Sequence, residues 1–239
     1  MKNIIAITVA FIFASPAFAQ DCVILLHGLA RSKLSMKAVE WRLEKADYIV
    51  VNNSYPSTRL SIPELSELSI SQSVSECNEH NSTQIHFVTH SLGGILLRQY
   101  FADHDIKNLG RSVMLGPPNQ GSKLADYIQS HSLGKKLQPQ AGRQLGTGLN
   151  AVPKGLGPVA FEVGVIAGTR NHRVLVSRPL DGPNDGTVTV AETRVAGMAD
   201  FIQLPATHTF MMWKGSVLDQ VEYFLQNGQF DHGEIEPLS

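Results

Sequence analysis

The sequence predicts an α/β protein with a mostly parallel central sheet. Three observations support this class: short continuous apolar runs, apolar residues at helical spacing between these runs, and repetition of this alternation along the chain. Repeated strand–helix–strand units place helices on both faces of a parallel sheet. With 239 residues, of which 43% are hydrophobic, the chain is long enough for one domain with a substantial core.

The N-terminus has the features of an export signal. Lys2 supplies a positive charge, a mostly apolar run covers Ile4 to Ala14, and Ala17-Phe18-Ala19 matches the small-x-small cleavage pattern. The run is too short for a membrane-spanning helix, which needs about 20 apolar residues. We therefore expect a signal peptide at residues 1–19. The mature domain, residues 20–239, is expected to have no transmembrane segment and to be periplasmic or secreted.

Cys22 and Cys77 are the two cysteines of the chain. An even number of cysteines in an exported protein favours a disulfide between them. Closing a loop of this length would stabilise the fold by about 4 kcal/mol in the chain-entropy description. The alternative is two separate buried thiols.

Strands and helices alternate in the N-terminal half. Strands are expected at Cys22–Leu26, Tyr48–Val51 and Ile85–Thr89, and helices at Leu34–Ala46, Ile62–Cys77 and Leu92–Ala102. The first helix is supported by Met36, Val39 and Leu43, which fall at helical spacing. The second helix accommodates Pro63 because proline is tolerated in a first helical turn.

The C-terminal half is predicted to contain a long excursion between two strands. Residues 119–158 lack clear periodicity and are rich in glycine, proline and glutamine, so we interpret them as a cap-like segment that covers the site. The elements expected around it are a strand at Ser112–Leu115, a helix at Lys123–Leu137, strands at Phe161–Ala167 and Phe201–Leu204, a final helix marked by Val217, Val221 and Phe224, and a frayed tail from Gln229.

A candidate nucleophile lies at the junction of a strand and a helix. In Thr89-His90-Ser91-Leu92-Gly93-Gly94, Ser91 follows an apolar strand and precedes an apolar helix. A serine on such a sharp turn raises its hydroxyl above the edge of the sheet, and the crowded turn requires small neighbours. Gly93 provides one of them, whereas Thr89 stands where glycine is usual. The alternative is a serine that only caps the helix.

Two backbone N–H groups are candidates for an oxyanion hole. The N–H of Leu92 lies at the start of the helix after Ser91, where the helix dipole is positive. His27-Gly28-Leu29 follows the first mature strand, and its glycine would let the backbone turn close to the nucleophile. Leu29 is therefore the second candidate donor.

Activation of a serine requires a histidine base that is oriented by a buried carboxylate. His208 is preferred among nine histidines because it lies between a predicted strand and the final helix. The alternative is that His208 is a surface histidine whose hydrogen bonds are satisfied and which has no catalytic role. We interpret His27 and His90 as structural. Asp185 is preferred over Asp181 as the carboxylate, because the apolar segment that follows it would bury the side chain. Either aspartate could instead simply form a turn.

Together these motifs resemble the bacterial lipase and esterase branch of the α/β-hydrolases. The resemblance rests on His27-Gly28-Leu29, His90-Ser91-Leu92-Gly93-Gly94, residues 116–122 (GPPNQGS), Asp185-Gly186-Thr187-Val188 and His208, in the chain order serine, aspartate, histidine. It implies the α/β-hydrolase fold and hydrolysis through an acyl-enzyme. Some relatives hold calcium, but the sequence contains no distinct acidic cluster, and we predict neither a metal nor a cofactor.

The sequence thus predicts a serine hydrolase that cleaves carboxylic esters, with a small-molecule ester or a lipid as substrate. The formal net charge is −1 and no stretch is rich in lysine or arginine, so nothing indicates a nucleic-acid partner. The alternatives are an acyltransferase or an amidase with the same three residues, and a non-catalytic lipid carrier or chaperone on the same fold.

Overall fold

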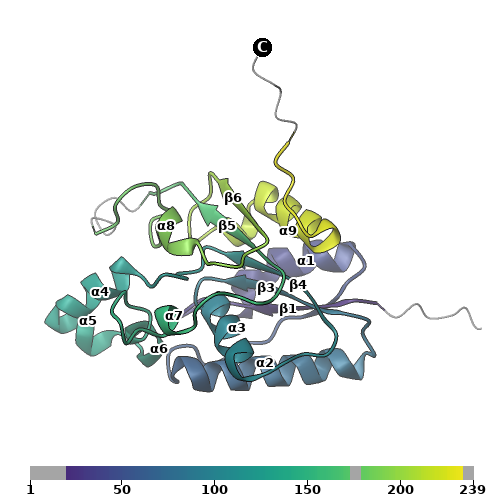
Figure 1. The fold of residues 1–239 in the computed structure, drawn as a ribbon, viewed down its shortest axis with the longest axis horizontal. Coiled ribbons are helices and arrows are strands. Elements are labelled where there is room, and N and C mark those ends of the chain that lie inside the picture. The colour runs from purple at the N-terminus through teal and green to yellow at the C-terminus, as the bar shows by residue number, and fades with distance from the viewer. Residues whose placement is uncertain (1–19, 173–178, 234–239) are drawn as a thin grey trace, which may run out of the picture.

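Six parallel strands form one sheet in the part of the chain that the structure describes (Figure 1). The structure is a computed structural model and describes residues 20–172 and 179–233, so the predicted signal peptide lies outside the described residues. The strands are β1 (Cys22–Leu26), β2 (Ile49–Val51), β3 (Ile85–His90), β4 (Leu109–Leu115), β5 (Val163–Gly168) and β6 (Asp200–Leu204), in the order β2-β1-β3-β4-β5-β6. The predicted α/β class with a mostly parallel sheet is confirmed.

Helices cover both faces of the sheet (Figure 1). One face packs against α2 (Ile62–Glu79) and α3 (Leu92–Asp103), and the other packs against α1 (Lys37–Lys45) and α9 (Gly215–Asn227). Alternate residues of β1 belong to the two cores, because successive side chains of a strand point to opposite faces. Ile24 belongs to the core with α2 and α3, and Val23 to the core with α1 and α9.

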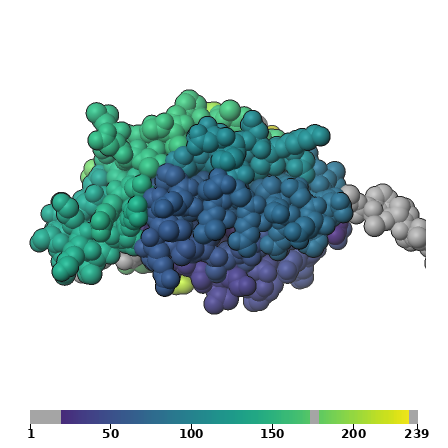
Figure 2. Space-filling view, turned by 90° about the horizontal axis from the view of Figure 1, so that it is seen from below, coloured from purple at the N-terminus to yellow at the C-terminus, as the bar shows by residue number. Residues whose placement is uncertain are grey.

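The predicted helix Lys123–Leu137 is wrong as a single element. The structure has α4 (Lys123–Ser130) and α5 (Ser132–Leu137), separated by His131 in an extended conformation. The His131 ring accounts for the break locally, since its Nδ1 lies 2.8 Å from the carbonyl oxygen of Tyr127. The remainder of the excursion contains the short helices α6 (Gln140–Arg143) and α7 (Val152–Gly155). Seen from below in Figure 2, the excursion projects from one end of the face that α2 covers.

Short elements also flank the functional loops. The predicted helix Leu34–Ala46 begins as a 3-10 turn, η1 (Lys33–Met36), before α1, and two further short elements are α8 (Val190–Thr193) and η2 (Met211–Trp213). Among the described residues, no helix combines the length and apolar character needed to cross a membrane.

The prediction of a frayed tail from Gln229 is wrong at Phe230. Its side chain is buried and its ring centroid lies 4.9 Å from that of Phe224. The backbone N–H of Phe230 also donates to the Asp200 carboxylate at 2.7 Å. These contacts hold the segment after α9 against the sheet.

A disulfide joins Cys22 to Cys77, as predicted from the even cysteine count. It connects β1 to the last turn of α2, with the two Cα atoms 5.8 Å apart, and both residues are fully buried. This separation lies within the usual range for a disulfide.

A buried arginine attaches the excursion to α3. Arg98 is 5% exposed, and its guanidinium donates to the backbone oxygens of Asn119, Pro153 and Gly157 and to the side-chain oxygen of Asn119, at 2.7–3.2 Å. No carboxylate among the described residues pairs with it. Burial lowers the pKa of Arg98 to about 10, so the group remains a cation at neutral pH. The two ends of the excursion are thus bound to one helix by charge-assisted hydrogen bonds.

We expect Arg98→Met to lower the free energy of unfolding by about 3 kcal/mol, because it leaves several buried carbonyl oxygens without a donor. Urea denaturation of the purified protein measures this change. Arg143→Met is the matched control, since Arg143 lies on the same excursion and its side chain makes one described hydrogen bond, to the carbonyl oxygen of Gln138. Equal losses in the two variants would contradict the role assigned to Arg98.

Candidate active site

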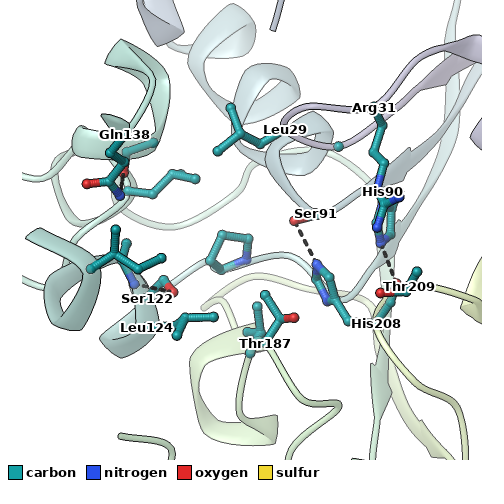
Figure 3. Close-up of a pocket in the computed structure, with 17 residues that line it drawn as sticks. Leu29, Arg31, His90, Ser91, Ser122, Leu124, Gln138, Thr187, His208 and Thr209 are labelled. Carbon is teal, nitrogen blue, oxygen red and sulfur yellow. Dashed lines mark hydrogen bonds between the residues drawn. The ribbon is translucent and has the colours of Figure 1, made fainter. Parts of the chain in front are cut away.

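Ser91 lies on a sharp turn between β3 and α3. Its backbone has φ 53° and ψ −117°, a conformation that is unfavourable for a residue with a side chain. Two backbone hydrogen bonds hold the turn: the N–H of Ser91 donates to Leu115 at 2.9 Å, and the N–H of Gly94 donates to Ser91 at 3.0 Å. The turn places Ser91 at the edge of the sheet where the strands have their carboxyl ends. Ser91 lines a pocket there (Figure 3).

Glycines allow this turn to pack against its neighbours. A Cβ at Gly93 would lie 2.5 Å from the carbonyl oxygen of Leu26, so no side chain fits there. A Cβ at Gly94 would lie 3.0 Å from Pro117 and 3.3 Å from the hydroxyl of Thr89. The space that Gly94 leaves open accommodates Thr89, which stands where glycine is usual.

The structure brings His208 and Asp185 together with Ser91. The Oγ atom of Ser91 lies 3.0 Å from Nε2 of His208, and Nδ1 of His208 lies 2.7 Å from Oδ2 of Asp185. Figure 3 shows the first of these contacts. Ser91 follows β3, Asp185 follows β5 and His208 follows β6. The three side chains therefore meet because parallel strands end at the same edge of the sheet.

The backbone fixes the Asp185 carboxylate. Its Oδ1 atom accepts hydrogen bonds from the N–H groups of Thr187 at 3.0 Å and Val188 at 2.8 Å. The N–H of His208 donates to the carbonyl oxygen of Asp185 at 3.0 Å. The Asp185 side chain is fully buried. Oδ2 thus remains available for the imidazole, in a fixed orientation.

Gly116 is a site residue whose role cannot be read from its spacing alone. It has a φ of +55°, and a Cβ there would lie 3.0 Å from Oδ2 of Asp185 and 3.2 Å from Nδ1 of His208. The Gly-Pro-Pro sequence after β4 signals a turn, but not this closeness to the aspartate–histidine contact. Gly116 is needed because any side chain would intrude on that contact.

Asp181, the alternative carboxylate, lies away from the histidine. Its side chain is 84% exposed and forms an ion pair with Lys123 at 2.9 Å. In the structure it is Asp185, not Asp181, that contacts His208.

His90 supports His208 through the backbone. The His90 side chain is buried, and its Nε2–H donates to the carbonyl oxygen of His208 at 2.9 Å. Burial is the main cause that lowers the pKa of His90 well below its ordinary value, and the charges of His208 and Arg31 add to it. Sequence reasoning could not find this contact, because the two histidines are 118 positions apart.

His27 has no contact with Ser91 or His208 among its described interactions. Its ring stacks on Tyr55 with centroids 3.9 Å apart, its Nδ1–H donates to the Gly28 carbonyl, and its Nε2 accepts from the Tyr55 N–H. Burial lowers the pKa of His27. The neutral ring thus shapes the loop that leads from β1 to the pocket.

A pocket of about 210 Å³ adjoins Ser91 and His208 (Figure 3). The excursion supplies its apolar side with Leu124, Ile128 and Leu145. Leu29, one of the two predicted oxyanion donors, lines the pocket. The other, Leu92, is the first residue of α3, where backbone N–H groups have no intrahelical acceptor.

Residue types that commonly bind metal ions do not cluster in the described part of the chain. Within residues 20–172 and 179–233, no group of three or more histidine, cysteine, aspartate or glutamate side chains is arranged to hold a metal ion.

Comparisons with known proteins show a likeness in structure. No protein-family model matches the sequence, and no curated protein matches it significantly. Among solved structures, a Bacillus licheniformis lipase in its mature form aligns with a TM-score of 0.68 at 19% identity, over 90% of this chain and 94% of that one. Aspergillus fumigatus lipase B aligns with a TM-score of 0.67 at 13% identity, over 89% of this chain and 55% of that one.

A third alignment is with an esterase of Pyrococcus furiosus. Its TM-score is 0.56 at 16% identity, over 87% of this chain and 83% of that one. The sheet and these likenesses define an α/β-hydrolase fold. More particularly, the two lipases and the esterase named above have this fold, which agrees with the resemblance predicted from the motifs.

Proposed function

We propose that this protein hydrolyses carboxylic esters through an acyl-enzyme formed on Ser91. The observation that carries the proposal is the unbroken chain of hydrogen bonds from Ser91 through His208 to Asp185, with the serine exposed to a pocket. This geometry is that of an activated nucleophile, its base and the group that orients the base. The fold shared with lipases and esterases supports the same reaction class.

The proposed reaction begins when Nε2 of His208 takes the proton of Ser91 and the serine oxygen attacks the ester carbonyl. The N–H groups of Leu29 and Leu92 stabilise the oxyanion, each contributing about 3 kcal/mol in comparable holes. His208 then protonates the leaving alcohol. Water activated by the same histidine attacks the acyl-enzyme and releases the acid.

Asp185 supports both steps without reacting. Its Oδ2 atom accepts the Nδ1–H of His208, which keeps Nε2 free to receive the serine proton. The same contact stabilises the imidazolium that forms during attack. His90 is a positioning residue, because it holds the backbone of His208.

The lining of the pocket favours a substrate with an apolar acyl group. Leu124, Ile128 and Leu145 surround the side of the pocket that the excursion forms. An acyl chain placed there would leave its carbonyl carbon next to Ser91. The excursion thereby covers the acyl group and helps to select it.

Labelling with a fluorophosphonate probe tests the proposal. The purified protein is expected to form a covalent adduct at Ser91, identified by peptide mass spectrometry. His208→Ala should label much more slowly, because the serine loses its base. Hydrolysis of a short p-nitrophenyl ester by the same preparation is the second readout. A folded protein that neither labels at Ser91 nor releases nitrophenol would contradict the proposal.

A further inference from the structure

Two arginines lie in adjoining cavities at the mouth of the candidate active site. Arg31 lines the pocket beside Ser91 and also lines an open groove of about 400 Å³. The groove is formed by Ala30, Arg31, Tyr55, Pro56, Ser57, Thr58 and Arg59. Neither lining contains an aspartate or a glutamate. The two cavities therefore share the positively charged Arg31, and the groove adds Arg59.

This positive charge is not neutralised within the described part of the chain. Neither Arg31 nor Arg59 forms an ion pair there, whereas Arg42 pairs with Asp219 and Glu222. The whole chain has a formal net charge of −1, so the two arginines form a local excess rather than part of a generally basic surface. An unpaired cation that lines a pocket is available to a ligand.

Arg31 lies on the same side of the pocket as His208. In Figure 3, Arg31 is grouped with His90, His208 and Thr209, while Ser122, Leu124 and Gln138 lie across the pocket. Arg31 is also near enough to His90 for its charge to contribute, after burial and the charge of His208, to the lowered pKa of His90. The excursion side of the pocket thus combines apolar side chains with the uncharged Ser122 and Gln138, whereas the His208 side has the cationic Arg31.

The proposed reaction relates these two sides to the two parts of an ester. His208 protonates the leaving alcohol, so the alcohol part must lie on the His208 side and the acyl part among Leu124, Ile128 and Leu145. We propose that the substrate is an ester whose alcohol part carries an anionic group, a phosphate or a carboxylate, bound by Arg31 with Arg59 in reach. This inference rests on the proposed ester hydrolysis.

The chemistry of arginine fits this role. A guanidinium presents paired N–H donors in a plane and binds phosphate or carboxylate oxygens in a bidentate manner. Thr58 lines the same groove and is exposed, so its hydroxyl can complete such a site, whereas Ser57 is buried and its hydroxyl accepts the N–H of Ala30 at 3.0 Å. The groove is open, so a bulky alcohol part could extend into solvent.

A matched series of soluble esters tests the inference. The substrates are the butyryl esters of glycerol 3-phosphate, of a hydroxycarboxylic acid and of glycerol, which share one acyl group and differ in charge. The measured quantity is the ratio of kcat/KM for each anionic ester to kcat/KM for the neutral one. We expect a ratio well above one for the unmodified protein, about tenfold lower in Arg31→Gln, and reduced by high salt, which screens exposed charges.

Lys33→Gln is the matched control. It removes a positive charge two residues along the chain from Arg31, and Lys33 lines neither cavity. It should keep the ratio of the unmodified protein. A ratio near one, or a ratio that Arg31→Gln does not change, would overturn the inference while leaving ester hydrolysis intact. Absence of turnover with all three esters would overturn the proposed function and the inference with it. The preferred ester of the two anionic ones distinguishes phosphate from carboxylate.

Discussion

Ser91→Ala is expected to lower kcat for ester hydrolysis by about 10⁶-fold, because the acyl-enzyme cannot form without the serine oxygen. The fold should remain intact. The Ser91 hydroxyl makes one side-chain hydrogen bond, to His208, and alanine carries a Cβ as serine does, so the exchange adds no atom at the turn with φ 53°. Hydrolysis of p-nitrophenyl butyrate measures the loss, and circular dichroism checks the fold.

Ser112→Ala provides the control for this exchange. Ser112 is a fully buried serine on β4, and its hydroxyl has no hydrogen-bond partner among the described residues. Its removal should leave kcat unchanged, since the residue lies outside the pocket. If Ser91→Ala kept more than about a thousandth of the activity, another nucleophile would have to be sought.

Asp185→Asn is expected to lower kcat by about 10⁴-fold with little change in geometry. The reason lies in the two oxygens of the carboxylate. Oδ1 accepts two backbone N–H groups, so the amide oxygen of an asparagine must take that position. The NH₂ group then faces His208 and donates to Nδ1, which forces the ring proton onto Nε2. A histidine in that tautomer cannot accept the serine proton.

Asp181→Asn is the matched control for Asp185→Asn. The Asp181 side chain is exposed and its described partner is Lys123, so its replacement should leave kcat unchanged. The two variants are compared under the same assay, with urea denaturation to confirm that both fold. A larger loss in Asp181→Asn than in Asp185→Asn would reverse the assignment of the carboxylate.

The sequence predicts the fold best where its signals are local. The continuous apolar run of β1 and the helical spacing of Met36, Val39 and Leu43 depend only on neighbouring residues, and the corresponding elements are present in the structure. The break at His131 coincides with a contact between its ring and the carbonyl oxygen of Tyr127, and the burial of Phe230 depends on contacts that form only after the chain has folded. Composition and periodicity contain no record of such contacts.

The same distinction applies to the site. Ser91 stands in a local motif, and the apolar residues after Asp185 correctly suggested a buried carboxylate; Val188 is buried and its N–H binds that carboxylate. By contrast, the attachment of the excursion by Arg98 joins α3 to carbonyl groups up to 59 positions away. Gly116 is likewise a site residue only because the loops of two other strands approach it.

The disulfide has a practical consequence for studying motion in this protein. Cys22 and Cys77 are its two cysteines, both are oxidised, and both are fully buried, so the folded chain offers no thiol to a maleimide. A single cysteine introduced at exposed Leu133 on α5 would therefore react alone. A fluorophore or spin label attached there would report whether the excursion shifts when a substrate analogue occupies the pocket, without any need to remove native cysteines first.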